Sequence, residues 1–161
     1  MSYPPTRYAG DGEVSATYRP ADAAPDLALP TTAVHYLATG GETGGDFGLY
    51  RWEMAAAPGG PAPHFHRSIS ESFYVLTGTV RLYDGRAWHD SRPGDFHFVP
   101  PGGIHAFGNE SGEPASMLLL FTPGAPREAY FEGLAEIVAS GRQLGPQEWT
   151  DFYREHDQYM V

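Results

Sequence analysis

Two segments of the sequence decide the fold: His64–Gly78, which reads HFHRSISESFYVLTG, and Gly94–Asn109, which reads GDFHFVPPGGIHAFGN. Because alternate residues of a strand share a face, His64 and His66 should project together, about 6.6 Å apart along the backbone. Glu71 opens an alternating run that places an acid at the end of an apolar strand face. The first segment therefore predicts two imidazoles and a carboxylate near one another.

His105 opens a similar alternating run in the second segment, with Phe107 on its side. Three imidazoles and one carboxylate suit a first-row divalent ion and leave one or two coordination positions open for water, oxygen or substrate. We therefore predict one metal ion per chain, held by four ligands: His64, His66, Glu71 and His105. The metal is Fe, Mn, Ni, Co, Cu or Zn, because this donor set does not select among them.

These spacings resemble the two motifs of the cupin family, H-x-H-(x)3,4-E-(x)6-G and G-(x)5-P-x-G-(x)2-H-(x)3-N. Both segments match without a gap, and the resemblance covers roughly residues 45 to 122. The family's first motif usually begins with a glycine six residues before the first histidine, where this chain has Pro58. Gly59 and Gly60 follow Pro58, so we expect the turn to be shifted by a residue or two.

The fold class follows from composition and pattern. The 161 residues suffice for one domain with a real core, and 20 glycines with 15 prolines divide it into short segments, as all-β proteins require. No helical period occurs from Val34 to residue 122. The natural closure is a two-sheet barrel, in agreement with the cupin-type double-stranded β-helix, or jelly roll, that the resemblance implies. We predict an irregular arm over 1–32, the barrel over 33–122 and a helical segment over 123–161.

The helical segment changes to a period of three and four residues. A helix should open at Pro126 and end near Gly141, and a second, shorter helix should start at Pro146 and run through Tyr153. Either the first helix merely covers the barrel surface or it helps to close the mouth of a pocket. The sequence leaves both possibilities open.

Strand details follow from alternation. Tyr50, Trp52 and Met54 should point inward, because Arg51 and Glu53 mark the outer face of their strand.

Two more features lie outside that strand. His97 alternates with Phe96 and Phe98, and we read it as facing solvent or a subunit contact. Asp84-Gly85 predicts a hairpin with a type I′ turn.

Composition excludes several kinds of chemistry and of partner. The chain has no cysteine and no lysine, which excludes thiolate and Schiff-base mechanisms. The net charge of −10 argues against nucleic acid and anionic membranes as partners. The longest purely apolar run, Met117–Phe121, is too short to span a bilayer, and we expect a cytoplasmic protein.

The predicted function is metal-dependent chemistry on a small molecule. The segment Phe121–Gly124 and the aromatic helix after it resemble single-domain cupins related to quercetin dioxygenases. This resemblance implies a dioxygenase that acts on a flavonol-like or other aromatic enol or phenol, with Glu71 as ligand and general base. Candidates for the substrate pocket are Tyr50, Trp52, Phe73, Phe107, Met117 and Phe121.

Two alternatives remain open. The first is a non-oxidative metal cupin, such as an isomerase, cyclase or decarboxylase that acts on a natural-product intermediate. The second is a cupin that binds a small ligand without turnover. We also expect a homodimer, because the N-terminal arm carries tyrosines, Ala115–Phe121 is apolar on both faces, and two-fold dimers are the commonest closed assembly.

Overall fold

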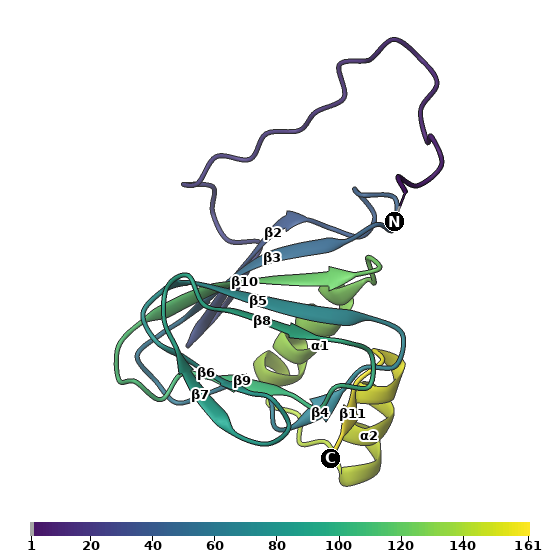
Figure 1. Cartoon of the computed structure of the whole chain (residues 1–161). Coiled ribbons are helices and arrows are strands. Elements are labelled where there is room, and N and C mark those ends of the chain that lie inside the picture. The colour runs from purple at the N-terminus through teal and green to yellow at the C-terminus, as the bar shows by residue number, and fades with distance from the viewer. Residues whose placement is uncertain (1) are drawn as a thin grey trace.

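The computed structural model describes residues 2–161 (Figure 1). In chain order its elements are β1 (Leu27–Leu29), β2 (Thr32–Ala38), β3 (Gly48–Met54), β4 (His64–Phe65), β5 (Ser70–Thr77), β6 (Val80–Tyr83), β7 (Trp88–Ser91), β8 (Phe96–Val99), β9 (Ala106–Gly108), β10 (Ala115–Thr122), α1 (Arg127–Ser140), α2 (Pro146–Glu155) and β11 (Tyr159–Met160).

The strands form two main sheets that face each other. The larger sheet has six strands in the order β1-β2-β3-β10-β5-β8, and the smaller has three in the order β7-β6-β9. A short antiparallel pair, β11-β4, lies beside α2 (Figure 1). This mostly antiparallel β-structure with two C-terminal helices confirms the predicted fold class and is consistent with a double-stranded β-helix.

The core lies between the sheets. Along β10 every second residue is buried, from Ala115 through Phe121, and the residues between them are half-buried. In β3, which pairs with β10, Tyr50 and Met54 are buried and Trp52 is half-buried against the same core. The predicted inward face of β3 is therefore confirmed.

Gly60 and Gly78 occupy positions that only glycine fits. Gly60 has a φ of +141°, and a Cβ there would overlap the carbonyl oxygen of Phe107. Gly78 has a φ of +68°, and a Cβ there would overlap the carbonyl oxygen of Pro114. Side chains rarely adopt such dihedrals, and here they would also collide with backbone. The turn that the family motif places at the position of Pro58 therefore falls at Gly60, two residues later.

Both predicted helices are present. The helix α1 ends at Gly141, which adopts the left-handed conformation (φ 66°) and donates its N–H to the carbonyl of Val138. The helix α2 starts with Pro146 in its first turn, and the Glu148 carboxylate accepts from the N–H of Gly145 at 2.9 Å. No helix in the described part of the chain is long and apolar enough to cross a membrane.

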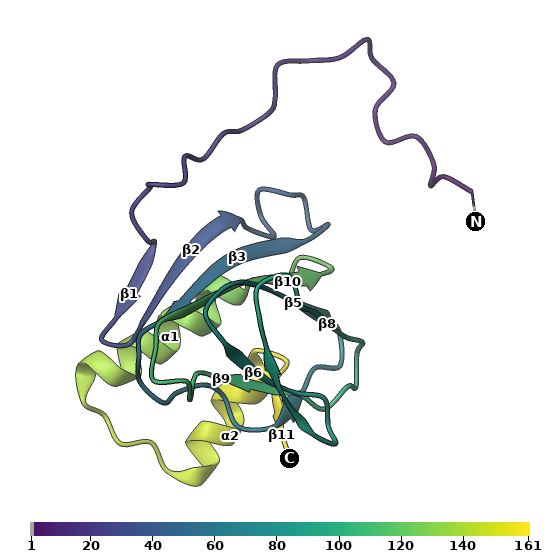
Figure 2. The same cartoon turned by 60° about the vertical axis from the view of Figure 1, so that its left-hand side comes forward.

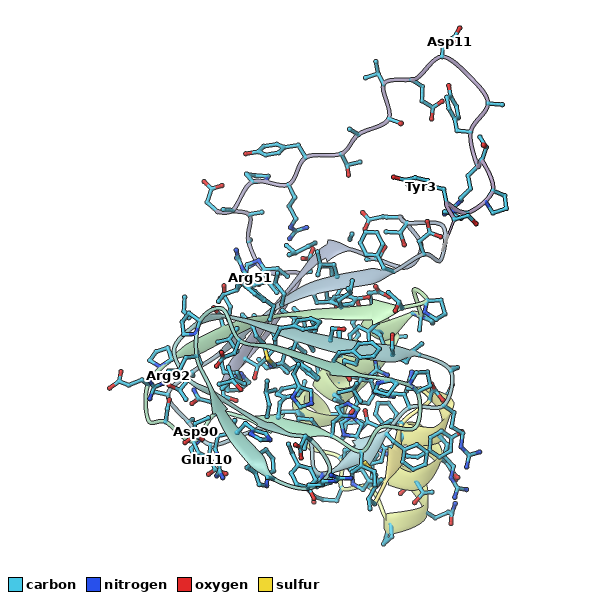
Figure 3. All side chains as sticks on the ribbon, viewed as in Figure 1. Tyr3, Asp11, Arg51, Asp90, Arg92 and Glu110 are labelled. Atoms are coloured by element: carbon cyan, nitrogen blue, oxygen red, sulfur yellow. The ribbon has the colours of Figure 1, made fainter. Side chains whose placement is uncertain are left out.

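The N-terminal arm extends away from the barrel (Figure 2). Residues 2–18 are exposed throughout, and Figure 3 shows Tyr3 and Asp11 standing clear of the packed interior. Arg7 forms an ion pair with Asp46, and Arg19 forms one with Asp26 at 2.6 Å. The strand β1 begins at Leu27 and pairs with β2, so ordered sheet structure starts inside the range predicted as irregular, 1–32.

The prediction that His97 faces outward is wrong. The strand β8 pairs with β5 in a register that sets His97 opposite Phe73, and the two rings lie 6.0 Å apart. Phe96 and Phe98 point outward instead, with 64% and 58% of their surfaces exposed. Hydrophobicity alone misassigned the faces, because β8 is an edge strand whose outer face carries the aromatic residues.

The hairpin of β6 and β7 is present, but its turn differs from the prediction. The turn spans Asp84–Ala87, and the Asp84 carboxylate accepts from the N–H groups of Arg86 and Ala87, each at 2.8 Å. Only Gly85 has a positive φ in this turn, whereas a type I′ turn needs two such residues. The Asp84 side chain stabilises the longer turn by capping its N–H groups.

Candidate metal centre

The backbone brings the predicted ligands together from three places in the barrel. His64 begins β4, Glu71 lies in β5, and His105 immediately precedes β9. His64 and His105 form an isolated antiparallel bridge, with N–H to carbonyl distances of 3.0 and 2.9 Å. The second motif is thereby joined to the first by main-chain hydrogen bonds. His66 follows β4 by one residue.

The ligand atoms of the four residues lie within 4.8 Å of one another, and all four side chains are buried. The Nε2 atoms of His66 and His105 are 3.2 and 2.8 Å from one oxygen of Glu71. Three nitrogens and a carboxylate oxygen at this spacing surround a position that one ion can occupy.

Hydrogen bonds fix the orientation of all three imidazoles. Each Nδ1 lies within hydrogen-bond distance of a backbone carbonyl, which can only accept, so Nδ1 carries a proton and Nε2 is the nitrogen left to bind a metal. Such bonds hold metal-binding histidines in place in known metal sites. The distances are 2.9 Å from His64 to Ala62, 2.7 Å from His66 to Asp157 and 3.0 Å from His105 to Gly103. The donor set and its orientation therefore fit a cupin metal site.

Burial and mutual contacts shift the pKa values of three of the four candidate ligands. Burial, and next the positive charge that His105 can carry, lower the pKa of His64 to about 4, so His64 is neutral at pH 7. Burial alone would raise the pKa of Glu71, but hydrogen bonds from His105 and His66 outweigh it and hold that pKa below its usual range. For His105, burial lowers the pKa, but the contact with Glu71 raises it more, and the net shift is upward.

Asp157 is a site residue that sequence reasoning missed. Its carbonyl accepts from His66, and its carboxylate accepts from the N–H of Ser68 at 2.8 Å and from the N–H of Arg67. Asp157 has a φ of 55°, the one positive value outside glycine among residues 2–161. Aspartate tolerates this conformation better than most residues, but the sequence around it gave no sign that the C-terminal tail returns to the first motif.

A cavity of about 300 Å³ opens beside the cluster. His64 and Glu71 form part of its wall. Of the six predicted pocket residues, Trp52, Phe107 and Phe121 line this cavity. Tyr50, Phe73 and Met117 do not line it, because they are buried in the core, where Tyr50 packs edge-on against Phe121.

The C-terminal helices close this cavity. Arg127, Tyr130, Phe131 and Leu134 of α1 contribute to its wall, as do Tyr153 of α2 and the tail residues Gln158 and Met160. Figure 1 shows α2 beside β4 and β11, and α1 behind the strands of the barrel. Of the two roles considered for the first helix, closing the pocket is the one that this geometry supports.

Comparison with known proteins agrees with the motifs and the fold. Residues 51–121 match the family model described as "Cupin domain". An uncharacterized protein from Aquifex aeolicus (strain VF5) is 34% identical over 61 residues, which is 38% of this chain; the chain spans about half (50%) of that relative's length.

Solved structures share the fold at low sequence identity. KdgF from Halomonas sp. is 17% identical with a TM-score of 0.57, and the alignment covers 67% of this chain and 94% of KdgF. A predicted oxalate decarboxylase from Thermotoga maritima is 16% identical with a TM-score of 0.58, covering 66% and 97%. The match over residues 51–121 and the shared fold together support the assignment of this part of the chain to the cupin family.

Proposed function

We propose that the chain is a metal-dependent enzyme that consumes dioxygen while it oxidises a flavonol-like or other aromatic enol or phenol. The observation that carries this proposal is the position of the cluster: His64 and Glu71 belong both to the metal site and to the wall of an aromatic cavity. A substrate in the cavity would therefore meet the metal site directly.

The chain's own residues would divide the work as follows. The aromatic side chains of Trp52, Phe107 and Phe121 would bind a ring and exclude water from it. A divalent ion bound here would supply Lewis acidity, which lowers the pKa of a substrate hydroxyl. Glu71 is ionised at neutral pH and can accept that proton through a carboxylate oxygen. Its depressed pKa makes it a weak base, so proton transfer depends on an acidified hydroxyl.

The alternatives from the sequence make different predictions. A non-oxidative metal cupin would convert its substrate without using oxygen, and a binding cupin would hold the ligand unchanged. The buried metal cluster alone does not separate these possibilities, because one barrel hosts many chemistries.

Measurement of oxygen uptake together with substrate loss distinguishes the dioxygenase from the non-oxidative enzyme and from the binding protein. Protein loaded in turn with Fe, Mn, Ni, Co or Cu should consume oxygen in step with substrate loss for at least one compound in a panel of flavonols and polyphenols. The measurement is an oxygen electrode coupled to chromatography of the substrate. Substrate loss without oxygen uptake would replace the dioxygenase with an isomerase, cyclase or decarboxylase, and ligand binding without loss would leave a binding protein.

We also propose that a second copy of this chain covers the outer aromatic face of β5 and β8. Tyr74, Phe96 and Phe98 are exposed there, at the edge of the six-stranded sheet where β8 has no further strand of the described chain beside it, and together they form an aromatic surface. The exposed arm, residues 2–18, could add to the same assembly. An isologous dimer would bury both the aromatic face of β5 and β8 and the N-terminal arm.

Sedimentation should give about twice the chain mass of 17.6 kDa. Replacing Phe96 and Phe98 with serine should shift the protein to monomer, and deletion of residues 2–26 should weaken the dimer while keeping β1. Replacement of exposed Val138 on α1 with serine is the matched control and should leave the dimer intact. A wild-type protein that stays monomeric at micromolar concentration would contradict the proposal.

A further inference from the structure

Arg127 places a buried positive charge in the cavity beside the metal centre. It is the first residue of α1, only 4% of its surface is exposed, and it lines the same cavity as His64 and Glu71. Arginine is almost never buried this deeply without a partner. Its presence in a mainly apolar wall therefore requires an explanation.

Of the carboxylates that the structure describes, none pairs directly with this charge, and Glu71 in the same cavity offsets only part of the cost of burying it. Nη1 donates to the carbonyl of His156 at 2.9 Å, while Nε is buried with no hydrogen-bond partner among residues 2–161. No carboxylate in the described part of the chain lies within 4.0 Å of this guanidinium. The rings of Tyr130 and Phe121 lie 4.4 and 5.0 Å from its central carbon, which offsets part of the lost hydration.

The position of Arg127 on the helix adds to the positive potential. The first turn of a helix is the positive end of its dipole, where acidic residues are stabilising and basic ones are not. The neighbouring acid, Glu128, accepts a hydrogen bond from the hydroxyl of Tyr50 instead of pairing with Arg127. Both the side chain and the helix terminus thus favour an anion at this end of the cavity.

We propose that Arg127 binds the carboxylate of an organic acid, whose apolar body lies along the aromatic wall and whose far end reaches the metal centre. This inference rests on the proposed function and narrows it to acidic substrates. With Nη1 engaged by His156 and Nε enclosed by protein, Nη2 is the donor left to bind a carboxylate oxygen. A phosphate ester would need more donors than this mainly apolar cavity offers.

Binding of matched acids and amides tests this inference without turnover. The probes are benzoate, phenylacetate and 3-(4-hydroxyphenyl)propanoate, each paired with its primary amide of nearly the same shape. Calorimetry on the metal-loaded protein should show at least one acid that binds about 10-fold or more tightly than its amide, since hydrogen bonds to charged groups are strong. Arg127→Gln should bring that ratio close to one.

A second Arg127 variant, a control variant and a crystal structure complete the test. Arg127→Met keeps the long apolar stem against Tyr130 and Phe121, so it should also lose the ratio if Arg127→Gln folds poorly. Arg86→Gln, which removes an exposed arginine outside the cavity, should keep the wild-type ratio. A crystal structure with the tightest acid should place its carboxylate on Arg127.

Several results would overturn the inference. They are a ratio that persists without Arg127, a carboxylate found on the metal instead, and a wild-type protein that binds none of the acids more tightly than its amide. The first two would leave Arg127 a structural link between α1 and the end of α2. These outcomes are separate from those of the proposed function, because acid selectivity can exist without oxygen uptake and oxygen uptake without acid selectivity.

Discussion

Glu71→Gln should lower turnover by about 100-fold or more while the barrel stays folded. The side chain is buried at the junction of the metal site and the cavity. An amide keeps the size of the carboxylate and can ligate weakly through its oxygen, but it carries no charge and cannot accept a proton. The variant should therefore retain part of its metal and lose most of its rate. Steady-state kinetics on the best substrate, with metal content measured on the same sample, gives the answer.

Glu136→Gln is the matched control, because Glu136 is an exposed acid on α1. It should keep the wild-type rate and metal content. A Glu71→Gln protein with undiminished turnover would remove the base role and leave Glu71 as a ligand at most. A variant that loses all metal would show instead that the carboxylate is indispensable for binding the ion.

Removal of the metal should lower the melting temperature by about 5–10 °C. An ion that binds only the native state, at about 100 times its dissociation constant, stabilises the fold by roughly 2.7 kcal/mol. In a chain of this size each kcal/mol shifts the melting temperature by about 2–4 °C. The measurement is a thermal melt of chelated protein, repeated after one equivalent of metal is restored.

Two histidine variants distinguish the site from non-specific binding. His66→Gln removes one of the four candidate donors. The variant should no longer gain stability from metal, because the three donors that remain bind the ion too weakly. His97→Gln removes a half-buried histidine outside the cluster and should respond as the wild type does. Identical melting of chelated and metal-loaded wild type would count against a bound ion.

The clustering of the four candidate ligands was predictable because the information that defines it is local. His64 and His66 share a strand face by their spacing of two residues, and Glu71 follows in the next strand of the same segment. His105 comes from a second segment whose spacing is equally fixed. The barrel strands and both helices were likewise predictable from the sequence, because the alternation of the strands and the change to a helical period after residue 122 are local patterns too.

The pocket was only half predictable. Alternation identifies inward-facing residues but does not say which of them border a cavity and which fill the core. Trp52 lies at the cavity while Tyr50, two residues earlier on the same face, packs against Phe121 and Phe131. That difference depends on where α1 lies, which no strand pattern encodes.

The rest of the site was not predictable from the sequence because it depends on distant contacts. Asp157 supports His66 across 91 residues of chain. Arg127 gave one signal that could have been used, a basic residue in the first turn of a helix, where the dipole disfavours it. The pairing of β11 with β4, which brings the tail to the site, involves strands too short to show any alternation.

The central claim is that three histidines and Glu71 bind one ion, and a crystal structure of the protein grown with Mn²⁺ or Ni²⁺ tests it most directly. Anomalous scattering should locate one ion per chain, about 2.0–2.2 Å from the Nε2 atoms of His64, His66 and His105 and from a carboxylate oxygen of Glu71. Each Nδ1 should keep its bond to a backbone carbonyl. An ion bound elsewhere, or no ion at this position in fully loaded protein, would contradict the account.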